Sequence, residues 1–223
     1  MTEAATSSSV GDYVKAIWEL AEAPADGAST KDIAARLSVA PASVTNMLIR
    51  LQERGLVQYE RYRGAVLTDE GRSEALRLIR RHRLIETFLL EHLGYSWQEV
   101  HDEAEKLEHA VSDLFTERLA ELLSYPNHDP HGHPIPKPDG SLPAEELFAL
   151  SEAEDEQSVV ISRVSDDNAS RLSYLGERGL VPGSRIRVRE VRELDGVVIV
   201  EDEAGETFSL GGPLAHSILV QSF

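Results

Sequence analysis

Apolar residues recur at helical spacing along the first part of the chain, which predicts helices. Residues 11–21 form one such stretch, with apolar positions at Tyr13, Val14, Ile17, Trp18 and Leu20. Ser29 is a typical N-cap, and residues 31–37 predict a short second helix behind it. Residues 1–9 are small and polar, so we expect a frayed leader and no secretory signal.

A third helix and a small hairpin are expected next. Pro41 suits the entry to a helix that continues over residues 43–54, and Gly55 is a residue type that ends helices. Residues 56–67 predict two short strands that turn near Arg63 and Gly64. The order helix, short helix, turn, helix, hairpin predicts a winged helix-turn-helix, with an ordinary helical hairpin as the alternative.

In a winged helix-turn-helix, the second helix of the pair enters the major groove of DNA. Its outward residues are small or polar here, as contact with base edges requires. Arginines on the wing would meet phosphates or the minor groove. The predicted DNA-binding residues are Thr30, Ala42, Ser43, Thr45, Asn46, Arg50, Arg61 and Arg63.

The rest of the chain predicts helices followed by strands. Thr68 caps a helix with an apolar stripe to about Leu89, and one long helix is expected from about Trp97 to Leu123. That long helix has more apolar surface than a lone helix could use, so we expect it to pack against a second copy of the chain. β-Branched runs separated by glycine turns from Ser158 onward predict a small antiparallel barrel.

The net charge of −17 is unevenly distributed. Residues 30–83 hold eleven Lys and Arg against six Asp and Glu, a net of +5. Residues 84–160 hold three against eighteen, a net of −15. A basic block followed by an acidic block indicates two different tasks, and the basic block can meet phosphates although the whole chain is acidic.

The composition excludes several classes of protein. The chain has no cysteine, which excludes disulfides, thiolate nucleophiles and cysteine-ligated zinc or iron–sulfur sites. No run approaches the roughly 18 apolar residues of a membrane span. We therefore expect a cytoplasmic protein whose metal ligands, where it has any, are oxygen and imidazole nitrogen.

Residues 101–109 carry the most informative pattern of the chain. On a helix, Glu105, Glu108 and His109 stand at i, i+3 and i+4 and share one face, with His101 one turn earlier. Two carboxylates and an imidazole on one patch would repel or shift their protonation unless a cation lay between them. A divalent metal ion is the simplest such cation, and a solvated acidic helix face is the alternative.

Taken together, these motifs resemble the diphtheria toxin repressor family of metal-dependent transcriptional regulators. The resemblance covers nearly the whole chain, in the segments 40–47 (APASVTNM), 67–72 (LTDEGR), 81–86 (RHRLIE), 101–109 (HDEAEKLEH), 130–136 (PHGHPIP) and 171–184 (RLSYLGERGLVPGS). It implies a mainly α protein with a small all-β domain. The expected domains are a winged helix-turn-helix at 1–73, a helical dimerisation and metal-binding domain at 74–143, a linker at 144–157 and an SH3-like, FeoA-type barrel at 158–223.

The resemblance implies a primary metal site made of Asp12, Glu105, Glu108 and His109. Iron-responsive members have methionine where Asp12 stands and cysteine where Glu105 stands, whereas manganese-responsive members have carboxylates at both places. Carboxylate oxygen suits Mn²⁺, and Fe²⁺ would also fit. Some manganese-responsive members have a second acidic residue one turn after the first, and this chain has Lys15 there, which puts a paired-manganese arrangement in doubt.

The resemblance also implies a second metal site with ligands from two helices, the loop and the tail. Its expected ligands are His82, Glu86, His101, Asp129, His131 and Asp166, the last of which could equally be Asp167. A helix–helix salt bridge is the alternative for the first three, and ordinary loop residues for the others. We interpret the remaining histidines as surface residues: His92, His128, His133 and His216.

The function implied is a homodimeric, manganese-dependent repressor that binds double-stranded operator DNA and controls manganese uptake, without an organic cofactor or a membrane. Three alternatives stay open. The first is an iron sensor of the same family. The second is a metallohydrolase, although the sequence has no further catalytic motif. The third is a regulator that responds to a small organic ligand, with the acidic helix in a structural role.

Overall fold

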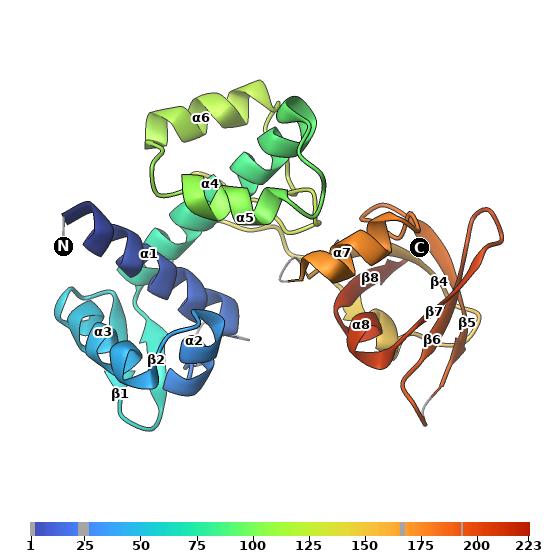
Figure 1. Cartoon of the computed structure of the whole chain (residues 1–223), viewed down its shortest axis with the longest axis horizontal. Helices are drawn as coiled ribbons and strands as arrows, with labels where there is room; N and C mark the ends of the chain where they lie inside the picture. Colours follow the sequence, from blue (N-terminus) through green and yellow to red (C-terminus); the bar gives the residue numbers. More distant parts are fainter. Residues whose placement is uncertain (1–2, 22–26, 166–167, 193) are drawn as a thin grey trace. The chain divides into compact units, whose positions relative to one another are not determined.

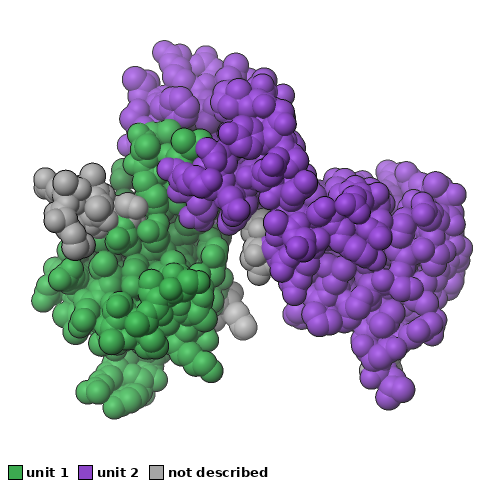
Figure 2. Space-filling model, viewed as in Figure 1, with its two compact units in different colours: residues 1–82, 107–111, 136–141 green, residues 83–106, 112–135, 142–223 purple. Residues whose placement is uncertain are grey.

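The computed structural model describes residues 3–21, 27–165, 168–192 and 194–223, and for residues 3–8 the backbone alone. The chain divides into two compact units (Figure 2). The first unit contains residues 1–82, 107–111 and 136–141, and the second contains residues 83–106, 112–135 and 142–223. Among the described residues, no helix combines the length and apolar character needed to cross a bilayer.

The first unit contains the predicted winged helix-turn-helix (Figure 1). Its elements are α1 (Glu3–Leu20), α2 (Thr30–Arg36), α3 (Pro41–Glu53), β1 (Val57–Glu60), β2 (Gly64–Leu67) and the start of α4 (Asp69–Leu93). The side chain of Ser29 caps α2 by accepting the Asp32 N–H at 3.1 Å. Pro41 opens α3, and β1 and β2 pair antiparallel with Tyr59 opposite Ala65. These features confirm the predicted fold of this region.

The apolar stripes of α1, α2 and α3 meet in one core. Its largest fully buried side chains are Ile17, Ile33, Leu48 and Leu51. The predicted leader was wrong in one respect, because α1 already begins at Glu3. Alanine at two of its first positions has a high helix propensity, so the helix begins well before the first apolar residue of the predicted stripe.

The long helix expected between Trp97 and Leu123 is wrong, because the chain forms two helices there. They are α5 (Val100–Leu107) and α6 (Asp113–Leu122). Ser112 starts the second one by accepting the Phe115 N–H at 3.2 Å. Glu108 and His109 therefore lie in the turn after α5 and do not continue its helical face.

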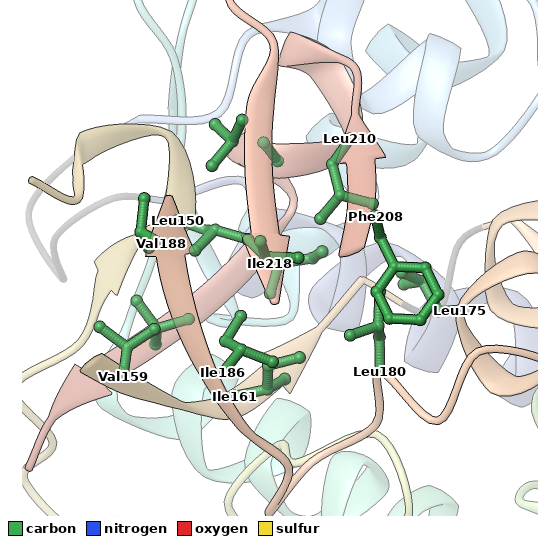
Figure 3. Close-up of a cluster of buried hydrophobic side chains, with 14 of the residues drawn as sticks. Leu150, Val159, Ile161, Leu175, Leu180, Ile186, Val188, Phe208, Leu210 and Ile218 are labelled. Atoms are coloured by element: carbon green, nitrogen blue, oxygen red, sulfur yellow. The ribbon is translucent and has the colours of Figure 1, made fainter. Parts of the chain in front are cut away.

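The C-terminal region is an antiparallel sheet in the order β3-β8-β4-β5-β6-β7. The elements are β3 (Phe148–Ala149), the 3-10 helix Leu150–Glu152, β4 (Ser158–Val164), α7 (Ala169–Gly176), β5 (Arg185–Val191), β6 (Val198–Asp202), β7 (Thr207–Leu210), α8 (Gly212–His216) and β8 (Ile218–Ser222). The sheet thus starts inside the segment expected to be a linker. Its strands and α7 enclose an apolar core that includes Ile161, Ile186 and Leu175 (Figure 3).

A loop of the second unit is folded tightly onto β4. The Val164 N–H donates to the His131 carbonyl at 3.0 Å, and the adjacent Gly132 has a φ of +87°. A Cβ at Gly132 would lie 2.0 Å from the Ser162 carbonyl oxygen. Glycine is needed here both for the backbone conformation and for the close approach to the strand.

We expect Gly132→Ala to lower the free energy of unfolding by at least about 2 kcal/mol, because it adds strain and a clash with backbone. Gly183→Ala is the matched control, since Gly183 has a φ of +93° but no atom within 4 Å of the position that a Cβ would take. Urea denaturation of both variants measures the difference. Equal losses in the two variants would contradict the close approach.

Candidate metal centre

A first group of polar side chains lies entirely within the first unit. Asp12 on α1 faces His109 in the turn after α5, with Asp12 Oδ1 2.6 Å from His109 Nε2. Glu108 Oε1 lies 3.5 Å from the same nitrogen. Asp12, Glu108 and His109 can each offer one ligand atom within 4.8 Å of the other two. This is the arrangement expected of three of the four predicted primary ligands.

The Asp12–His109 contact changes the protonation of the imidazole. The hydrogen bond from His109 to the Asp12 carboxylate raises the pKa of His109 above its usual value, although partial burial opposes the shift. Gly11 allows the ring to come this close, because a Cβ there would lie 3.0 Å from His109 Cε1. Without metal, the Asp12 carboxylate therefore favours the protonated form of His109.

A buried lysine completes this group, and sequence reasoning did not predict its contacts. Lys15 Nζ donates to Glu108 Oε2 at 2.9 Å and to Oε1 at 3.2 Å, and it lies 3.2 Å from His82 Nδ1. His82 Nδ1 also lies 2.5 Å from Glu108 Oε2. All three residues are buried, Glu108 completely. The signal in the sequence for a buried lysine was its position, because Lys15 stands one helical turn after Asp12 and between the buried residues Val14 and Ala16.

Glu105, the fourth predicted primary ligand, belongs to the second unit. It lies on α5, and its side chain is 38% exposed. Its Oε1 is 3.9 Å from His101 Nε2 one turn earlier on the same helix. Glu105 is thus a partly exposed residue of the second unit.

A second group lies within the second unit and contains the remaining predicted ligands. Glu86 Oε1 is 3.2 Å from His101 Nδ1 and 3.8 Å from His131 Nδ1. Asp129 joins Glu86 and His131, with ligand atoms within 4.8 Å of one another. All of these except His101 are buried, so the loop residues are not ordinary surface residues.

The Asp129 carboxylate is hydrogen-bonded to the backbone of its own loop. Asp129 Oδ1 accepts the N–H groups of His131 and His133 at 2.8 and 3.0 Å, and Arg83 Nε is 3.5 Å from Oδ2. His131 Nε2 lies 3.0 Å from the Trp97 carbonyl, which leaves Nδ1 without a hydrogen-bond partner among the described residues. A buried, unpaired imidazole nitrogen beside two carboxylates is suited to bind a cation.

The other histidines are mostly as expected. His92, His128 and His216 are exposed, and His128 Nε2 pairs with Glu145 at 2.6 Å. The surface assignment was wrong for His133, which is partly buried with Nδ1 3.4 Å from Asp129 Oδ2. Asp166 and Asp167 lie outside the described residues.

The predicted DNA-binding residues lie on α2, on α3 and on the hairpin of the first unit. On α3, Ala42, Ser43, Asn46 and Arg50 are exposed and Thr45 is partly exposed; Thr30, the first residue of α2, is also partly exposed. Arg61 and Arg63 are exposed on the hairpin loop, which Figure 1 shows reaching beyond α2 and α3. Between them Tyr62 is 93% exposed, and sequence reasoning missed it although an aromatic residue flanked by two arginines was visible.

The donors of both groups are carboxylate oxygens and imidazole nitrogens. Such donors suit hard or borderline divalent ions such as Mn²⁺ and Fe²⁺. The close approach of Asp12, Glu108 and His109 fits such an ion, because their ligand atoms already converge. The unpaired Nδ1 of His131 makes the second group fit as well.

Models of known protein families match three consecutive parts of the chain. The iron dependent repressor N-terminal DNA binding domain matches residues 5–65. The iron dependent repressor metal binding and dimerisation domain matches residues 68–137. The FeoA domain matches residues 148–222. The three together match nearly the whole chain in the order expected from its motifs.

Individual relatives match over their full length. The iron-dependent repressor IdeR of Mycobacterium tuberculosis is 30% identical over 221 residues, which cover 94% of this chain and 95% of the relative. A manganese-dependent transcriptional repressor solved in complex with manganese is 42% identical, with a TM-score of 0.90 over 96% of this chain and 100% of that one. ScaR with bound Cd²⁺ is 38% identical, with a TM-score of 0.82 over 96% and 99% of the two chains.

These relatives are transcriptional repressors and not enzymes, and the match includes the DNA-binding, the metal-binding and dimerisation, and the FeoA domains. The chain belongs to the iron-dependent repressor family of metal-dependent transcriptional regulators, together with IdeR and the diphtheria toxin repressor.

Proposed function

We propose that this protein is a manganese-activated homodimeric repressor that binds operator DNA and controls manganese uptake. The observation that carries the proposal is the convergence of Asp12, Glu108 and His109, two carboxylates and an imidazole without sulfur. The similarity to repressors solved with manganese supports the same metal. Fe²⁺ is the alternative metal, because IdeR of the same family is named as iron-dependent.

The proposed primary ligands are Asp12, Glu105, Glu108 and His109. A bound divalent ion would add positive charge where Asp12, Glu108 and His109 already converge. Asp12 comes from α1 of the DNA-binding domain, whereas Glu108 and His109 come from the turn after α5. Ligands from these two places would couple metal binding to the position of the reading helix, by a coupling free energy of about 1–3 kcal/mol.

The proposed second site contains His82, Glu86, His101, Asp129 and His131, with Asp166 as a further candidate. The donors that face each other inside the second unit are Glu86, His101, Asp129 and His131. Arg83 lies near Asp129 and offsets part of the negative charge in this group. This site would hold the loop and α4 together.

DNA contact is proposed for the exposed face of α3 and for the hairpin. Asn46 and Arg50 have side chains able to reach base edges or phosphates, and Arg61 and Arg63 would meet the backbone or the minor groove. The second copy of the chain would pack on α6, where Leu114, Phe115 and Leu122 are 71%, 47% and 58% exposed. Two reading helices in a dimer would then meet half-sites about 34 Å apart.

Operator binding with and without metal tests the proposal. The metal-stripped protein is used to select duplexes from a random pool in the presence of Mn²⁺, and the selected duplex is then titrated with Mn²⁺, with Fe²⁺ under anaerobic conditions, and with chelator. We expect tight binding with Mn²⁺ and a loss of about 5–150-fold on chelation. Equal binding by exhaustively chelated protein would refute metal activation.

The same preparation separates the alternative functions. Tighter operator binding with Fe²⁺ than with Mn²⁺ at equal free concentration would identify an iron sensor. Absence of heat when Mn²⁺ is added in a calorimeter would favour a regulator that responds to an organic ligand. Metal-dependent turnover of generic esters or phosphates would favour a hydrolase, which the repressor relatives do not support.

A further inference from the structure

We propose that the Lys15 ammonium is a built-in cation that takes the place of one metal ion beside Glu108, so that the primary site accepts a single ion per subunit. The proposal rests on the proposed metal-binding function and adds the number of ions that the site accepts. It makes Lys15 a residue that determines metal stoichiometry.

The ammonium contacts atoms of the kinds that bind metal ions. Lys15 Nζ lies 2.9 and 3.2 Å from the two oxygens of Glu108 and 3.2 Å from Nδ1 of His82. A carboxylate oxygen and an imidazole nitrogen are donors for hard and borderline divalent ions. Here the same donors face a side-chain cation that is covalently fixed to α1.

Burial makes this cation difficult to replace. Lys15 is 5% exposed, His82 is 4% exposed, and Glu108 is fully buried. A fully buried carboxylate requires a counter-charge, and Lys15 supplies it whether or not metal is present. A second ion between Glu108 and His82 would have to approach the ammonium at short range in a poorly screened environment, where like charges repel strongly.

Glu108 also faces the proposed single-ion site. Its Oε2 contacts both Lys15 and His82, and its Oε1 lies 3.2 Å from Lys15 Nζ and 3.5 Å from His109 Nε2. Asp12 Oδ1 approaches His109 from α1. The Glu108 carboxylate therefore lies between the Lys15 ammonium on one side and the proposed single-ion site on the other.

Metal counting on three full-length proteins tests the proposal: wild type, Lys15→Glu and Lys15→Arg. Each is stripped, loaded with Mn²⁺, separated from free metal and analysed by mass spectrometry of the metal, with calorimetry for the affinities. We expect Lys15→Glu to bind one Mn²⁺ more per subunit than wild type, because it gains a carboxylate and loses the ammonium. Lys15→Arg keeps a cation and should keep the wild-type count. Equal counts in wild type and Lys15→Glu would overturn the proposal.

The electron paramagnetic resonance spectrum of loaded wild-type protein gives a test that needs no variant. A single Mn²⁺ ion in the primary site gives the spectrum of an isolated ion, whereas two ions about 3.5–4 Å apart give a coupled spectrum. A coupled spectrum in the wild type would overturn the inference. If the wild type bound no Mn²⁺ at all, the proposed function would fail, and a gain of Mn²⁺ in Lys15→Glu would still support the role of Lys15.

Discussion

Asp12→Ala is expected to remove the response of DNA binding to Mn²⁺ while the protein stays folded. Asp12 faces His109 in the first group of polar side chains, and its side chain is 37% exposed. Its loss therefore leaves no cavity in the core, but it removes the ligand that would connect α1 to Glu108 and His109. In a fluorescence-anisotropy titration, the activation by metal, about 5–150-fold in the wild type, should fall to about 1-fold.

Two controls accompany the measurement on Asp12→Ala. Asp32→Ala removes an exposed acid of the same domain that caps α2 with Ser29, so it should retain the metal response. Circular dichroism of Asp12→Ala should match the wild type. An unchanged Mn²⁺ response in Asp12→Ala would show that Asp12 is not a ligand.

The same variant should change the titration of His109 in the metal-free protein. Because the folded-state pKa of His109 is raised, the Asp12–His109 pair stabilises the fold below the unfolded-state pKa, and this contribution is lost as pH rises through the folded-state pKa. In Asp12→Ala the pKa of His109 should fall towards its usual value, because the largest cause of the shift is gone. The ring resonances of His109 in an NMR titration measure this directly.

Local patterns were sufficient to predict the winged helix-turn-helix. The N-cap at Ser29, the proline at Pro41 and the glycine at Gly55 each mark the end of an element, and apolar spacing assigns the inward faces. The sequence did not reveal the break after α5, because Glu108 and His109 happen to stand three and four positions after Glu105, as they would on one continuous helix. Ser112 was the available signal, because its side chain can accept an N–H of a new helix and so compete with continuation of the previous one.

The contacts within the first and second groups of polar side chains could not be predicted from residue spacing alone. Lys15 and Glu108 are 93 positions apart, and the pairing depends on how α1 packs against the turn after α5. The resemblance to a known family supplied Asp12 and His109 as partners, but no family position predicted a buried ion pair at Lys15. In the loop, the orientation of His131 depends on backbone contacts with Asp129 and β4, which one-dimensional patterns do not contain.

Glu108→Ala is expected to destabilise the metal-free first unit by about 3–5 kcal/mol, because it leaves the Lys15 ammonium buried without its carboxylate. The double variant Lys15→Met/Glu108→Leu should recover most of this loss, since apolar side chains of similar volume avoid the desolvation cost of both charges.

Urea denaturation in chelator, followed through Trp18 fluorescence in a Trp97→Phe background, measures the first unit separately. Arg77→Ala in the same background is a control within the first unit, because its pair with Glu74 is exposed and worth only about 0–1 kcal/mol. If Glu108→Ala unfolded at the same urea concentration as the Arg77→Ala control, the carboxylate would not be a necessary partner of the ammonium. If the double variant were no more stable than Glu108→Ala, removal of the buried ammonium would have restored no stability. The loss in Glu108→Ala would then come from altered packing around position 108.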